Sequence, residues 1–94
     1  MKTILIDWSV IRNVEDFYAK VLPQTEAPSW HGHNLNAIND SWVTGDICPS
    51  GPPFNFVFRG FRDISLDMRE VSKAVSKIAQ HSVNEHGGEV SYED

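Results

Sequence analysis

The sequence has little cysteine, little positive charge and no long apolar run. Its one cysteine, Cys48, cannot form an intramolecular disulfide, and we interpret it as a small packed side chain and not as a nucleophile. No stretch approaches the roughly 18 apolar residues that a membrane span needs. The four residues between Lys2 and Asp7 are too few for a secretory signal. We therefore expect a cytoplasmic protein without membrane contact.

The shortage of basic residues also limits the class of partner. Eight Lys and Arg residues stand against 13 Asp and Glu residues, so the formal net charge is −5. Without a basic cluster the chain lacks the positive patch that phosphate-backbone binding requires, and we expect no direct contact with nucleic acid. A basic protein is the more natural counterpart of this acidic protein.

The apolar residues are sufficient for one folded domain. Residues of the apolar class make up 40% of the chain and aromatic residues 11%, which argues against a disordered acidic tail. A chain of 94 residues has room for one core and not for two. We therefore predict a single domain over residues 1–94.

The first half of the chain predicts one strand and two helices. Residues 3–6 form a short β-branched run, which is typical of a strand covered on both faces. Asn13 is a potential N-cap for a helix over residues 14–22, whose apolar residues recur three and four apart. Residues 24–33 contain two helix breakers and are predicted to form a loop. A second helix should cover residues 34–44 and end at the following glycine.

The second half predicts strand, helix and strand. Residues 54–58 form an apolar run suited to a central strand. A helix over residues 66–85 would begin with Asp67 and Glu70 at capping-box spacing and stop at a pair of glycines. Residues 89–92 would form a last strand, with Val90 and Tyr92 on one face. The order β-α-α-β-α-β predicts an α/β fold, a small three-stranded parallel sheet packed by helices with right-handed crossovers.

The predicted helix over residues 34–44 has two unlike faces. At about 100° per residue, an apolar stripe collects Leu35, Ile38 and Trp42. A second face collects Asn36, Asn39, Asp40 and Val43. The simpler interpretation is a surface helix whose polar residues face water. Asparagine and aspartate are poor helix formers, however, and their density here favours a functional face.

Metal binding and catalysis are two alternative functions for the polar residues of this chain. The chain has no phosphate loop, cysteine pair or G-x-S-x-G elbow. A metal site would have to unite the four histidines, which are His31, His33, His81 and His86. Their spacing matches no standard ligand pattern, so we expect no metal and no other cofactor. Acid-base chemistry by Asp40 with a histidine remains conceivable. Without a nucleophile or second carboxylate beside it, we expect no enzyme activity.

One segment resembles a known family signature. Residues 30–40 read WHGHNLNAIND and are followed by Thr44-Gly45-Asp46. This resembles the barstar-type ribonuclease inhibitors, whose pattern is aromatic-x-Gly-x-Asn-Leu-Asp-Ala-Leu/Phe-x-Asp and then Thr-Gly. The resemblance implies a barstar-like fold and an intracellular inhibitor of the immunity or antitoxin type. Its partner would be a basic ribonuclease or a ribonuclease-type toxin domain, occluded at its active site and bound 1:1 by a monomer.

The resemblance also implies which residues contact that partner. Asp40 matches the aspartate that occupies the enzyme's phosphate-binding site, and Trp30 matches the aromatic that packs near its catalytic histidine. Gly32 would permit a close backbone approach or a positive φ. The implied contact residues are Trp30, His31, Gly32, Asn34, Leu35, Asn36, Ala37, Asn39, Asp40, Val43, Thr44 and Asp46.

Three departures from the family pattern stand out. Asn36 replaces the first aspartate of the motif, which removes a negative charge from the implied contact face. One additional residue lies between Asp40 and Thr44. Residues 61–64 leave room for at most one helical turn where the family has an extra helix. An alternative is therefore a barstar-fold module that regulates a partner other than a nuclease.

Overall fold

The computed structural model describes residues 2–27, 32–44 and 53–93. In chain order the main elements are β1 (Lys2–Asp7), α1 (Val14–Val21), α2 (Leu35–Asn39), β2 (Phe54–Arg59), α3 (Arg69–His86) and β3 (Gly88–Glu93). Three 3₁₀ turns, Leu22–Thr25, Phe61–Asp63 and Leu66–Met68, and one π-helical turn, η2 (Asp40–Thr44), complete them. The predicted α/β class and element order are confirmed.

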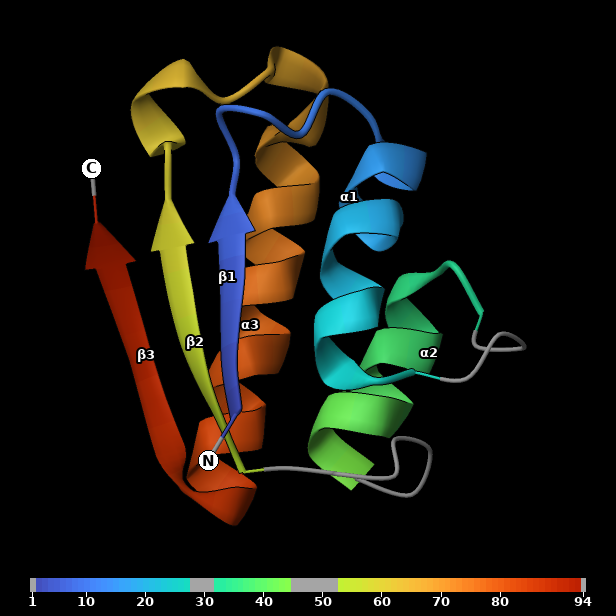
Figure 1. The fold of residues 1–94 in the computed structure, drawn as a ribbon, viewed down its shortest axis with the longest axis vertical. Helices are drawn as coiled ribbons and strands as arrows, with labels where there is room; N and C mark the ends of the chain where they lie inside the picture. Colours follow the sequence, from blue (N-terminus) through green and yellow to red (C-terminus); the bar gives the residue numbers. More distant parts are fainter. Residues whose placement is uncertain (1, 28–31, 45–52, 94) are drawn as a thin grey trace.

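The three strands are parallel and lie in the order β1-β2-β3, so β2 is the central strand as predicted (Figure 1). The register aligns Ile4 with Phe56 and Phe56 with Val90. Both connections step in the same direction across the sheet. Two crossover connections of the same hand that step in the same direction lie on the same side of the sheet. The helices therefore cover one face of the sheet.

This arrangement corrects the prediction that the first strand is covered on both faces. Ile4 and Ile6 are fully buried, whereas Leu5 between them is 41% exposed. Strand β2 alternates in the same way, with its three phenylalanines buried and Val57 half-buried. The sheet therefore has a helix-covered face and an open face, which the composition of residues 3–6 did not reveal.

The core lies between the covered face of the sheet and the helices and is rich in aromatic rings. Trp8 stacks on Phe17 of α1 with ring centroids 5.6 Å apart. Trp42 packs on Phe56 of β2 at 4.9 Å, so the segment after α2 is held directly on the central strand. Aromatic side chains bury large areas each, which allows a small chain to stabilise one core.

The helix ends agree with the sequence in part. Asn13 caps α1, because its side-chain oxygen accepts a hydrogen bond from the Asp16 amide at 2.8 Å. The predicted loop over residues 24–33 begins later than expected, since the Leu22–Thr25 turn continues the helical path. The capping box of α3 was wrong. Asp67 lies inside the Leu66–Met68 turn, and the N-cap of α3 is Met68 without a side-chain bond.

The other predictions for the second half hold, except that α3 begins at Arg69 and not at residue 66. Gly87 ends α3 with a φ of 91°, a backbone region that glycine enters at little cost. Val90 and Tyr92 share a face, because they pair with Phe56 and Phe58 in the register. Within the described ranges no helix has the length and apolar content needed to cross a bilayer.

Candidate protein-binding surface

The candidate site is built on residues 35–44, where α2 runs directly into η2; we call this segment the α2–η2 helix. Asn34 begins it, because its side-chain oxygen accepts a hydrogen bond from the Ala37 amide at 2.8 Å. This N-cap satisfies one of the free amides of the first turn. Apart from the π-helical turn, the helix predicted over residues 34–44 is confirmed. The glycine expected to end it lies outside the described residues.

The two faces predicted from the spacing are also present. Ile38 and Trp42 are fully buried, and Leu35 is partly buried against the same core. On the other side Asn36 and Asp40 are exposed. Asn39 and Val43 are half-buried beside them. The helix therefore presents amides and one carboxylate outward from a buried stripe.

Asp40 is the only carboxylate of the α2–η2 helix. Its side chain makes no ion pair or hydrogen bond with any residue that the structure describes. An exposed carboxylate in this position is available to cationic donors of a partner. Charge-assisted hydrogen bonds from Arg, Lys or protonated His are the strongest that such an oxygen accepts.

Sequence reasoning missed the π-helical turn that begins at Asp40. A π-helical turn is one residue wider than an α-helical turn. The additional residue relative to the family motif lies between Asp40 and Thr44, which are the two ends of η2. Buried Ser41 donates its hydroxyl to the carbonyls of Ala37 and Ile38 at 3.1 and 3.2 Å. The chain therefore stays helical through η2 with Trp42 in the core.

The segment before the α2–η2 helix is tied to α1. His33 Nδ1 donates to Glu15 Oε2 at 3.0 Å, and its ring stacks on Tyr18 with centroids 5.3 Å apart. Gly32 lies in a tight space and has no positive φ. A Cβ at this position would lie 2.9 Å from the Asn34 side chain and 3.2 Å from the Ala37 Cβ. Of the two expected reasons for this glycine, the positive φ is wrong and the close backbone approach to a partner stays a prediction.

The far end of the α2–η2 helix is tied to α3. His86, the last residue of α3, donates Nε2 to the carbonyl oxygen of Val43. Two of the four histidines, His33 and His86, thus lie at opposite ends of the α2–η2 helix and tie it to α1 and α3. His31 lies outside the described residues. Within the described ranges no three His, Cys, Asp or Glu side chains gather so that they could hold a metal ion.

We expect His86→Ala to loosen η2. Losing a hydrogen bond of this kind should lower the free energy of unfolding by about 0.5–1.5 kcal/mol. Amides of residues 40–44 should exchange faster with deuterium, because local opening becomes easier. His81→Ala is the matched control, since His81 is exposed on the same helix. Equal exchange in both variants would show that the His86 contact does not hold η2.

Tyr18, which supports His33, gives a pH prediction. Burial, and after it the charge of Glu15, raises the pKa of the Tyr18 hydroxyl above its ordinary value of 10.0. Above about pH 10 the unfolded chain releases this proton before the folded chain does. The free energy of unfolding should therefore fall as the pH rises through the folded pKa. Urea midpoints should fall less steeply in Tyr18→Phe; a parallel fall in both proteins would contradict this.

Nine of the implied contact residues lie within the described residues. Four of them are exposed: Asn34, Asn36, Asp40 and Thr44. Five are half-buried: Gly32, Leu35, Ala37, Asn39 and Val43. Trp30, His31 and Asp46 lie outside the described residues. The described contact residues lie on one continuous segment, residues 32–44.

Comparison with known proteins assigns the chain to a family. A search of curated proteins found no match. A family model does match: the Barstar model, described as barnase inhibitor, fits residues 1–91. That match covers β1, the α2–η2 helix, β2, α3 and the first residues of β3, and the chain therefore belongs to the Barstar family.

Proposed function

We propose that this protein binds a ribonuclease and blocks its active site with the outward face of the α2–η2 helix. The observation that carries the proposal is Asp40, an exposed carboxylate without a partner among the described residues, on a helix whose opposite stripe is fixed in the core. The family description as barnase inhibitors supports it. In this proposal the protein has no catalysis of its own.

The chemistry of the target favours such a mimic. A ribonuclease must bind phosphodiesters, and it does so with cationic and hydrogen-bond donors in its cleft. The Asp40 carboxylate can accept the same donors in place of a phosphate. Because Ile38 and Trp42 hold the helix, little backbone freedom is lost when the partner binds.

Charge and specificity come from different residues in this proposal. The net charge of −5 attracts a basic enzyme over long range and raises the association rate. Close to the cleft, Asp40 supplies the charge, and the amides of Asn36 and Asn39 supply directional hydrogen bonds. Asn36 stands where the family motif has an aspartate. The cleft of the partner enzyme should therefore be less uniformly basic than a cleft that binds two carboxylates.

The biological setting follows from the same proposal. A ribonuclease that the cell makes or meets must be neutralised where RNA is present, so an immunity or antitoxin-type role in the cytoplasm fits best. The partner would be a basic ribonuclease or a ribonuclease-type toxin domain. One α2–η2 helix fills one cleft, which gives a 1:1 complex with a monomer.

The test is a titration of RNA cleavage. The purified protein is added to barnase and, in parallel, to the ribonuclease encoded by a neighbouring gene. Cleavage should fall in proportion to the added protein and end at one equivalent for the cognate enzyme. If both enzymes cleave RNA at an unchanged rate in the presence of several equivalents of the protein, ribonuclease inhibition is refuted.

A second function is favoured by one residue. Asn36 weakens the match to a strongly basic cleft, and the same face could regulate a partner other than a nuclease. Stable binding to a neighbouring gene product that has no ribonuclease activity would favour this alternative. Loss of that binding in Asp40→Ala would place it on the same face.

A further inference from the structure

The two outer edges of the sheet differ. At the edge of β1, the Gln24 side chain pairs with both backbone groups of Leu5. The Leu5 amide donates to Gln24 Oε1 at 2.7 Å, and Gln24 Nε2 donates to the Leu5 carbonyl at 2.7 Å. Gln24 also donates to the Lys20 carbonyl, which fixes its amide group. A side chain therefore occupies the position that a neighbouring strand would take.

The outer edge of β3 has no such cover. Within the part of the chain that the structure describes, β3 pairs with β2 alone. It lies at the margin of the molecule, away from α1 and α2 (Figure 1). An open edge presents unpaired amides and carbonyls, which form a template for a further strand.

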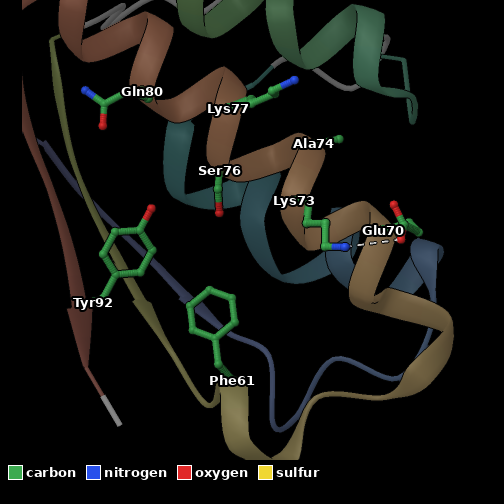
Figure 2. Close-up of a pocket in the computed structure, with 8 residues that line it drawn as sticks. All are labelled: Phe61, Glu70, Lys73, Ala74, Ser76, Lys77, Gln80 and Tyr92. Atoms are coloured by element: carbon green, nitrogen blue, oxygen red, sulfur yellow. Dashed lines mark hydrogen bonds and ion pairs between the residues drawn. The ribbon is translucent and has the colours of Figure 1, made fainter.

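A groove lies beside β3 on the helix-covered side. It has a volume of about 810 Å³ and lies between β3, α3 and the turn Phe61–Asp63. Phe61 and Tyr92 form one wall, and Ala74, Ser76 and Lys77 of α3 line the other (Figure 2). Tyr92 is 60% exposed although it stacks on Phe58 at 5.5 Å. A strand added to β3 would direct every second side chain toward this groove.

The alternate side chains of that added strand would lie on the open face, beside the outward side chains of Glu89, Ser91 and Glu93. Glu89 and Glu93 of β3 point to the open face, because Val90 and Tyr92 between them point to the helices. Glu93 pairs with Arg59 at 2.8 Å. Glu89 has no ion pair with any described residue. Lysine or arginine beside Glu89 would therefore be favoured at this edge.

We propose that the edge of β3 binds an extended segment of a partner protein as a fourth strand. The segment alternates apolar residues, which enter the groove, with basic residues, which meet Glu89. A second copy of this chain fits less well. Antiparallel pairing of two β3 strands about Ser91 would bring Glu89 of one copy beside Glu93 of the other. The site is separate from the α2–η2 helix and leaves that helix accessible.

The probe is a blocked nonapeptide of alternating lysine and valine, with an alternating glutamate and valine peptide as its control. In an NMR titration, the lysine peptide should shift the amides of residues 88–93 and of the groove. It should bind at least about tenfold more tightly than the glutamate peptide. A dissociation constant of about 1 mM is weaker than that of most specific contacts. If the amides of residues 88–93 do not shift at about 1 mM lysine peptide, the proposal is overturned.

A charge reversal sharpens the test. Glu89→Lys should weaken binding of the lysine peptide and strengthen binding of the glutamate peptide, each by about tenfold. Asp67→Lys makes the same change of net charge at an exposed site away from β3 and should leave the peptide preference unchanged. An equal effect of both variants would reduce the binding to general attraction and reject the edge site. Concentration-dependent shifts of residues 88–93 without peptide would assign the edge to a second copy, also against the proposal.

Discussion

Asp40→Ala is expected to raise the dissociation constant of the ribonuclease complex by about 30-fold or more. This corresponds to about 2 kcal/mol, the usual threshold for an interface hot spot. The donors of the enzyme's phosphate site would remain buried in the complex but lose their acceptor, and an unpaired buried charge is costly. The effect should be mainly on the dissociation rate, which stopped-flow competition or surface binding kinetics can measure.

Two control variants separate this local effect from long-range attraction. Asp67→Ala removes the same charge from an exposed site before α3 and should change mainly the association rate. Asp40→Asn keeps the shape of the side chain and removes its charge, so it should lose most of the affinity that the Ala variant loses. Equal dissociation rates for Asp40→Ala and the original protein would exclude the phosphate-mimic role.

Trp42→Ala is expected to give the largest loss of stability. Trp42 is fully buried and packs on Phe56, so removal of its ring leaves a cavity under the α2–η2 helix. Aromatic-to-alanine changes in cores cost about 3–5 kcal/mol. For a domain of this size the melting temperature should fall by at least about 12 °C. Urea unfolding and thermal melting followed by circular dichroism would measure both quantities.

Trp42→Phe is the matched control for that variant. It keeps an aromatic ring against Phe56 and removes an indole N–H that has no hydrogen-bond partner among the described residues. Losing an unpaired buried donor offsets part of the packing loss. The Phe variant should therefore lose less than half the stability that the Ala variant loses. Similar urea midpoints for Trp42→Ala and the original protein would show that the α2–η2 helix does not depend on this contact.

The elements could be predicted where a local pattern determines them. Ile38 and Trp42 occur four residues apart, and the same spacing that predicts an amphipathic helix places both in the core. Gly87 ends α3 for a local reason, because glycine adopts a positive φ at little cost. The outward position of Asp40 then follows from the buried position of its neighbours.

The features that sequence analysis missed depend on contacts between distant residues. Leu5 belongs to an apolar run, but it faces the open side because both crossovers place the helices on the other side. Asp67 has capping-box spacing, yet a 3₁₀ turn takes up its position before α3 begins. The contact of His86 with Val43 joins residues 43 positions apart, and no local pattern indicates it.

The π-helical turn is an intermediate case. The sequence carries a signal for it, one additional residue between Asp40 and Thr44, but a longer loop would give the same signal. The structure decides between them. The chain stays helical through this segment as a π-helical turn, and Ser41 and Trp42 are fully buried.

The central claim, that the α2–η2 helix occupies the phosphate-binding site of a ribonuclease, is tested most directly by competition. The dissociation constant of the complex with the cognate ribonuclease is measured at increasing concentrations of a nucleotide 3′-phosphate that binds the enzyme's active site. If Asp40 takes the place of the phosphate, the apparent dissociation constant should rise in proportion to the nucleotide concentration. A dissociation constant that does not change at saturating nucleotide would contradict the claim, because both molecules would then be bound at once.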